Sequence, residues 1–185
     1  MKDIYIETPF DDQTVMQLKA GDKVYISGVV YTARDAAHER MMKLISDGKP
    51  LPFDIEGQAI YYAGPAPAAP GHVIGPAGPT TSGRMDVYTP ALIERGLKCM
   101  IGKGGRSKTV VDSMKKNTAV YMAAVGGAGA KIARCVKESS IVAFGDLSPE
   151  AIYKLIVEEF PAIVAIDCYG NDQYQTGIKI YGRNQ

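Results

Sequence analysis

Residues 97–127, LKCMIGKGGRSKTVVDSMKKNTAVYMAAVGG, contain the pattern that decides the fold. The apolar run over 97–104 predicts a strand, the spacing of apolar residues in 105–117 predicts a helix, and 118–127 predicts a second strand. A strand that is apolar at consecutive positions is typical of a sheet covered on both faces. The stretch therefore predicts a strand–helix–strand unit of an α/β protein.

The same alternation continues toward the C-terminus. Ser148 as a cap, Pro149 at the first helical position and Glu150 near the positive end of the dipole predict that a helix begins here. The remaining pattern is a run of apolar segments separated by short turns. The expected elements are a helix over 129–138, a strand over 140–145, a helix over 148–160 and a strand over 161–170.

Toward the N-terminus the sequence predicts more strands and two further helices. One helix places Ala37, Met41, Leu44 and Ile45 on a single face and ends at Gly48. Residues 64–79 are rich in proline and glycine, and their apolar residues favour an ordered loop with a brief strand at 72–74 over a flexible linker. The other expected elements are strands over 1–9, 22–33 and 58–64 and a helix over 85–96.

Length and composition limit the kind of protein. The chain has 185 residues, of which 46% are hydrophobic and 22% charged, and we expect one soluble globular domain over 1–185. A formal net charge of +1 without basic runs disfavours a nucleic-acid partner. No segment is apolar enough for a signal peptide or a membrane span, which predicts a cytoplasmic protein.

The cysteines and histidines do not form a metal motif. Cys99, Cys135 and Cys168 are widely spaced, no CxxC pair occurs, and the only histidines are His38 and His72. We expect the three cysteines to be buried reduced thiols. The sequence thus predicts no metal site made by this chain alone.

The glycine-rich loop GKGGR over 102–106 follows a predicted strand and precedes a helix, which is where α/β sheets place ligands. It is not a nucleotide phosphate loop, because Ser107 stands where the second glycine of that motif belongs. Gly102 and Gly104 would let backbone amides approach an anion, and Lys103 could supply a charge. A tight turn with a solvated lysine is an equal alternative.

The segment GPTTSGRM over 78–85 is more specific. Thr80, Thr81 or Ser82 could cap the following helix, but a cap does not explain three hydroxyls followed by Arg84. A cation near the positive end of a helix indicates that an anion is bound there. The segment therefore favours a carboxylate or phosphate pocket.

A third junction, YTARDAAHER over 31–40, places Arg34 and Asp35 at the end of a strand. Arg34 could be a second anion clamp, and Asp35 could cap the helix or orient the arginine. His38 could lie behind the site or be solvated, and the solvated position is favoured. Arg34, Arg84 and Lys103 with the Thr80 hydroxyl fit a small dicarboxylate, but they supply no electrophile.

The run GPTTSGRMDVYTP over 78–90, with YTARDAAHER before it and MIGKGG after it, resembles the β subunit of iron–sulfur-dependent class I fumarases and L-tartrate dehydratases. In longer relatives this unit is the C-terminal domain. The similarity extends from about Lys23 to Gly177. It implies a swivelling β/β/α domain, related to the mobile domain of aconitases, with a mixed sheet flanked by helices.

The resemblance also implies a partner and a reaction. A separate α subunit carries a [4Fe-4S] cluster with one open iron that acts as a Lewis acid, and the β chain itself binds no cluster. The reaction is the reversible hydration of fumarate to L-malate. The alternatives are dehydration of L-tartrate to oxaloacetate, or a non-catalytic anion-binding module of the same fold. An α₂β₂ assembly is expected, or a homodimer of the isolated β subunit.

Matching the family motifs residue by residue assigns roles. Arg34 and Arg84 bind substrate carboxylates, Lys103 helps to hold the substrate, and Thr80 is the candidate base at the carbon next to a carboxylate. A threonine needs a nearby cation or a dry pocket to act as a base. The supporting residues are Asp35, Thr81, Ser82, Gly102 and Gly104.

Overall fold

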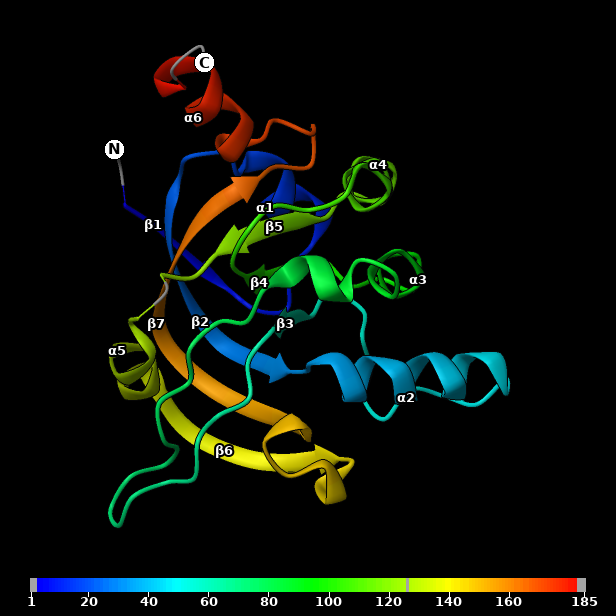
Figure 1. Ribbon diagram of the computed structural model, residues 1–185, viewed down its shortest axis with the longest axis vertical. Helices are drawn as coiled ribbons and strands as arrows, with labels where there is room; N and C mark the ends of the chain where they lie inside the picture. Colours follow the sequence, from blue (N-terminus) through cyan, green and yellow to red (C-terminus); the bar gives the residue numbers. More distant parts are fainter. Residues whose placement is uncertain (1–2, 126, 183–185) are drawn as a thin grey trace.

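The computed structural model describes residues 3–125 and 127–182, and it is built around one seven-stranded sheet (Figure 1). The described strands are β1 (Asp3–Glu7), β2 (Lys23–Thr32), β3 (Ala59–Tyr61), β4 (Cys99–Gly102), β5 (Val120–Ala123), β6 (Val136–Ala143) and β7 (Ile152–Ile166). The described α-helices are α1 (Asp12–Gln17), α2 (Asp35–Ser46), α3 (Thr89–Ile93), α4 (Lys108–Asn117), α5 (Gly129–Cys135) and α6 (Gln173–Tyr181). Two 3₁₀ segments, η1 (Ser82–Met85) and η2 (Gly145–Glu150), complete the described elements.

The sheet is mixed. β1 to β5 pair in parallel in that order, whereas β7 runs antiparallel to β5, β6 and β2. Because β7 pairs with both β5 and β2, the strands β2, β3, β4, β5 and β7 close a ring. The expected α/β class with a mixed sheet and flanking helices is confirmed.

The strand–helix–strand unit predicted over 97–127 is confirmed. β4 and β5 pair in parallel, with Cys99 opposite Val120 and Ile101 opposite Met122, and α4 connects them. The Ser107 side chain accepts a hydrogen bond from the Val110 amide and caps α4. A capped connecting helix and apolar strands are the local signals that the sequence provided for this unit.

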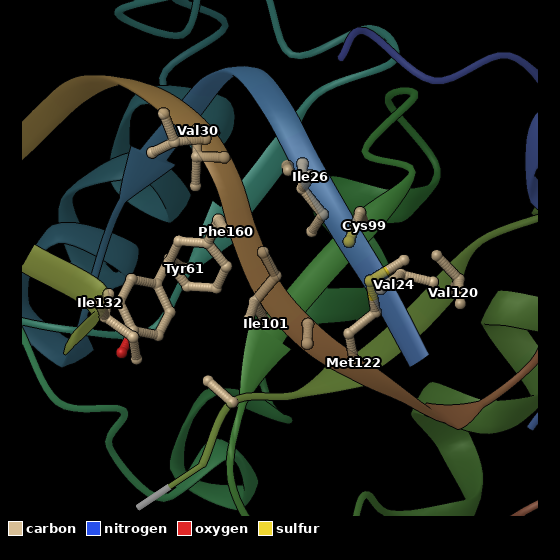
Figure 2. Packing of buried hydrophobic residues seen from close by; sticks show 14 of the residues in the cluster. Val24, Ile26, Val30, Tyr61, Cys99, Ile101, Val120, Met122, Ile132 and Phe160 are labelled. Atoms are coloured by element: carbon tan, nitrogen blue, oxygen red, sulfur yellow. The ribbon is translucent and has the colours of Figure 1, made fainter. Parts of the chain in front are cut away.

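Successive residues of these strands are buried in two different cores, which confirms that both faces of the sheet are covered. Tyr61, Ile101 and Met122 face the interior of the ring, where Phe160 of β7 joins them (Figure 2). Their strand neighbours Tyr62, Met100 and Tyr121 pack instead with residues of α2, α3 and α4. Helices α2, α3 and α4 accordingly lie together on one side of the sheet (Figure 1).

The helix predicted over 148–160 is wrong. Ser148 does not cap a helix: its φ and ψ are 57° and −118°, and β7 begins at Ile152. Short apolar runs fit both the helical and the strand period. Here strand pairing decides the secondary structure, since β7 forms an antiparallel ladder with β2 from Tyr153 to Ile163. Long-range pairing thus overrides a local start signal.

Other differences are smaller. The helix expected over 129–138 ends at Cys135, α1 and α6 were not predicted, and residues 72–74 form no strand. The loop of 64–79 has internal order, because its arms pair through Ala66 and Gly75, and the Tyr61 hydroxyl donates to the Ala77 carbonyl at 2.6 Å.

Candidate functional site

The candidate site lies where three neighbouring parallel strands end. β2, β3 and β4 are adjacent in the sheet and point the same way, so their carboxyl ends share one edge. Arg34 follows β2, Lys103 follows β4, and the loop after β3 returns to the same edge at Pro79, opposite Ala63. The three predicted junctions are therefore brought together by the order of the strands.

Backbone hydrogen bonds hold the threonine segment between the extensions of β3 and β4. The Thr80 amide donates to the Tyr62 carbonyl at 2.7 Å, and the Lys103 amide donates to the Thr80 carbonyl at 3.3 Å. The Ser82 amide in turn donates to the Lys103 carbonyl at 2.9 Å. Thr80 and Lys103 are thus neighbours through their backbones.

Thr80, Arg84 and Asp35 form a polar cluster, which we call the rim cluster. Arg84 Nη2 donates to Thr80 Oγ1 at 2.6 Å and to Asp35 Oδ2 at 3.0 Å, and Arg84 Nε lies 2.9 Å from Asp35 Oδ1. About half of the Arg84 side chain (47%) remains exposed. The cation expected near an anion is therefore paired with Asp35, and Asp35 orients an arginine rather than capping α2 with its side chain.

Arg34 lies next to this cluster. Its Nη2 is 3.7 Å from Asp35 Oδ2 and 3.5 Å from Glu150 Oε1, and 27% of its side chain is exposed. Asp35 thus lies between the two arginines. Glu150 was assigned only to a helix start by its sequence, and the structure instead places it beside Arg34.

Ser82 has a different role from the predicted cap. No side chain caps η1: Thr81 at its N-cap makes no such bond, and Thr80 Oγ1 accepts from Arg84. Ser82 is fully buried, and its hydroxyl pairs with the Tyr121 hydroxyl at 2.9 Å. Tyr121 donates its one proton to the Gly104 carbonyl at 2.8 Å, so Ser82 donates to Tyr121.

This network explains both supporting glycines. A Cβ on Gly102 would lie 2.0 Å from Ser82 Oγ, so only glycine leaves room for the buried hydroxyl. Gly104 has φ of +82°, a conformation that favours glycine. The loop that carries Lys103 is consequently fixed from both sides, while the Lys103 side chain is exposed and has no ion pair or hydrogen bond to the residues described.

A second polar cluster, the buried cluster, was missed by sequence reasoning. Arg106 Nε donates to Asp86 Oδ1 at 2.7 Å and its Nη2 donates to Thr89 Oγ1 at 2.8 Å. The second oxygen of Asp86 accepts from the Ser107 amide at 2.6 Å. The Arg106 side chain is fully buried, and its guanidinium lies over the rings of Tyr62 and Tyr121. The cluster ties the loop after β4 to the segment between η1 and α3.

His38 is buried, so the favoured solvated position is wrong. Its ring packs against Tyr62 and Tyr88, and its Nδ1 lies 2.9 Å from the Arg34 carbonyl, to which the Nδ1–H donates. Burial lowers the pKa of His38 to about 4, against the opposing hydrogen bond to Arg34. His38 is therefore neutral at pH 7 and supports the backbone of Arg34 from behind the site.

The cysteines do not fit an iron–sulfur cluster. Cys99 and Cys168 are buried in the core and Cys135 is half-buried, so the expectation of three buried free thiols holds for two. Burial raises the pKa of Cys99, which opposes the thiolate that a cluster requires. Within residues 3–125 and 127–182, no three Cys, His, Asp or Glu side chains gather in a metal-binding arrangement. Over the same residues, none of the helices has the length and apolar character to span a membrane.

Comparison with known proteins defines the class of the chain. Residues 1–177 match the family model described as fumarase C-terminus. The chain belongs to this fumarase C-terminal family, as the motifs around Thr80 indicated, and the predicted family resemblance is confirmed.

The relatives are of two lengths. The chain is 38% identical to fumarate hydratase 2 of Leishmania major over 91% of its own length, and 40% identical to the anaerobic class I fumarate hydratase of Escherichia coli over 86%. It spans only 30% and 29% of those two proteins. A protein of Methanocaldococcus jannaschii, named as a candidate L(+)-tartrate dehydratase subunit beta, is 40% identical over 87% of this chain and 86% of that subunit.

Proposed function

We propose that the chain is the β subunit of a class I fumarate hydratase, which adds water reversibly to fumarate to form L-malate. One observation carries the proposal: Thr80 Oγ1 accepts a 2.6 Å hydrogen bond from the half-exposed Arg84 at a sheet edge that also presents Arg34 and Lys103. The three cations can pair with the carboxylates of a small dicarboxylate, and the hydroxyl can take the proton that the reaction removes from it. The names of the two fumarate hydratase relatives support the same reaction class.

Thr80 is the proposed base. A guanidinium that donates to Oγ1 stabilises the alkoxide over the hydroxyl, because hydrogen bonds to the charged form favour it. In the malate-to-fumarate direction, Thr80 takes the proton from the carbon next to one carboxylate, and the electron pair of that C–H bond forms the double bond. The hydroxyl group leaves the neighbouring carbon with its own bonding pair. In the hydration direction Thr80 returns the proton.

Arg34, Arg84 and Lys103 are the proposed carboxylate ligands. An arginine fork matches a carboxylate in two parallel hydrogen bonds, so two arginines suit a substrate with a carboxylate at each end. In the structure their guanidinium groups are held by Asp35 and Glu150. A substrate carboxylate would bind to donors whose directions are already set, which reduces the entropy lost on binding.

We propose that the electrophile comes from outside the residues of this sequence. The thiols of this chain are unsuited to a cluster, so we propose a partner α subunit that carries the [4Fe-4S] cluster, which when bound acts as a Lewis acid. We further propose that this chain is the swivelling β/β/α domain of the assembly and closes over the partner. The relative named as a tartrate dehydratase subunit beta, of which the match covers 86%, supports a separate partner.

L-tartrate dehydratase is the second candidate, because the relative of similar length bears that name. Tartrate differs from malate by one hydroxyl, and polar contacts to that group decide between them. The test is anaerobic mixing of this chain with a cluster-loaded α subunit, followed by measurement of fumarate formed from malate and of oxaloacetate formed from tartrate in parallel assays. Fumarate formation from malate is expected. Tight association without turnover of either substrate would overturn the proposal.

A further inference from the structure

The turn between β6 and β7, residues 144–151, contacts the first half of α2 (Figure 1). Arg40 Nη1 donates to Asp146 Oδ1 at 2.8 Å, and the Arg40 guanidinium lies 5.3 Å from the centre of the Phe144 ring. This turn is far from the motif residues in sequence, but it reaches the edge of the sheet where Arg34 lies.

Glu150, at the end of this turn, makes two contacts with the start of α2. Its Oε2 accepts a hydrogen bond from the Ala36 amide at 3.1 Å, and its Oε1 lies 3.5 Å from Arg34 Nη2. One carboxylate thus satisfies a free amide in the first turn of the helix and also attracts the guanidinium of the residue that precedes it.

The Arg34 side chain is confined by the same turn. A Cβ on Gly64 would lie 2.8 Å from the Pro149 carbonyl oxygen and 3.3 Å from both Cδ and Nη1 of Arg34. Arg34 Nε is buried without a partner among the described residues. The Arg34 side chain and the Pro149 carbonyl therefore both lie close to Gly64, and the Arg34 guanidinium lies beside Glu150.

The backbone of the turn is strained. Ser148 has φ of 57° and ψ of −118°, a backbone conformation that residues other than glycine seldom adopt. The Ser148 carbonyl accepts from the Ala151 amide at 3.0 Å and from the Tyr153 hydroxyl at 3.3 Å. A strained conformation persists only where its surroundings hold it, and here it brings Pro149 and Glu150 against Arg34.

We infer that Glu150 is a positioning residue for substrate recognition, which fixes the direction of the Arg34 guanidinium so that it meets a dicarboxylate. The inference rests on the proposed function, since it takes Arg34 to be a carboxylate ligand. Glu150 acts through Arg34 and requires no contact with the substrate. Its loss should therefore raise KM far more than it lowers kcat.

The first test compares two variants in the assembled enzyme. Glu150→Gln keeps an oxygen for the Ala36 amide but removes the charge facing Arg34, whereas Asp146→Asn weakens the same turn through Arg40 without touching Arg34. We expect Glu150→Gln to raise the KM for malate by about 5-fold with kcat within about 2-fold, and Asp146→Asn to leave both near wild type. Equal effects of the two variants would mean that the turn is only structural.

The second test needs no activity. In the isolated chain, ¹⁵N relaxation of the Arg34 Nε–Hε group, assigned by its loss in Arg34→Lys, reports the order of the guanidinium. We expect this group to be rigid in wild type and in Asp146→Asn, and mobile in Glu150→Gln. An inactive assembly with this pattern would sink the proposed function and leave the positioning role standing. Unchanged order in Glu150→Gln would overturn the positioning role whatever the activity.

Discussion

The rim cluster and the buried cluster contain the same three side chains, an arginine, an aspartate and a threonine, in different surroundings. In the rim cluster Arg84 pairs with Asp35 and Thr80, and the two charged side chains are 47% and 38% exposed. In the buried cluster Arg106 pairs with Asp86 and Thr89, and the two charged side chains are 0% and 12% exposed.

The difference in exposure separates two tasks. A buried ion pair is costly to break because the remaining charge loses its partner in a medium of low dielectric constant. An exposed ion pair contributes little to stability, and its side chains can exchange their contacts with each other for contacts with a ligand. We therefore expect the buried cluster to support the fold of the site, and the rim cluster to perform its chemistry.

The largest expected effect concerns the two threonines. Thr80→Ala should reduce turnover of the assembled enzyme by about 10²- to 10⁴-fold, the usual contribution of a general base, and leave the melting temperature unchanged. Thr81→Ala is the matched control, since Thr81 is exposed and makes no cap. Thr89→Ala should do the opposite, lowering thermal stability more than turnover per folded molecule. Normal turnover in Thr80→Ala would assign the base to the partner.

The next effect concerns the two arginines. Arg106→Met leaves Asp86 buried and unpaired, and should lower the free energy of unfolding by about 3–5 kcal/mol in urea denaturation. Arg84→Met breaks a half-exposed pair, and should change that free energy by less than about 1 kcal/mol. Equal losses in the two variants would remove the distinction between the clusters.

The buried side chain of His38 should make the stability of the chain depend on pH. Its pKa is lowered to about 4 in the folded chain from 6.5, so the unfolded chain binds more protons between these values. Its contribution to stability is fully present above pH 6.5 and is lost as pH falls toward 4, by roughly 3 kcal/mol. His38→Gln should flatten this part of the curve in urea titrations at several pH values. The control His72→Gln, at an exposed position, should follow wild type. If the stability of His38→Gln fell with pH as steeply as that of wild type, His38 would not be the group responsible.

The smallest effect is a conservative change in the rim cluster. Arg84→Lys keeps the charge but loses the fork that contacts both Asp35 oxygens and Thr80. We expect KM for malate to rise by about 10-fold, because lysine does not form a bidentate pair, with a smaller fall in kcat. Steady-state kinetics of the assembled enzyme measure both, and Lys103→Arg provides a comparison in which the charge is also kept. An unchanged KM would show that Arg84 does not bind a carboxylate.

The candidate residues after β2, β3 and β4 were predictable because they rest on local signals. Each strand is marked by apolar residues, and parallel order alone brings Arg34, Thr80 and Lys103 to one edge. The motif around Thr80 favoured a ligand pocket over a helix cap, and the structure shows no side-chain cap on η1. The strand–helix–strand unit of β4, α4 and β5 was predictable for the same reason.

What was missed depends on contacts between distant segments. Glu150 reaches Arg34 only because β7 forms a long ladder with β2, and the same ladder overrode the helix signal at Ser148. Arg106 meets Asp86 through the packing of two loops, and His38 is covered by Tyr62 and Tyr88, which lie in other elements. No local period or propensity encodes such contacts.

The proposed role of Thr80 is to move the proton at the reacting carbon. The most direct measurement follows deuterium from D₂O into L-malate at the carbon that loses the proton, using the assembly of this chain with a cluster-bearing α subunit. We expect rapid incorporation with wild type and Thr81→Ala, and with Thr80→Ala a rate at least about 100-fold slower, which is the lower bound for a general base. Equal incorporation by Thr80→Ala and wild type would contradict this role.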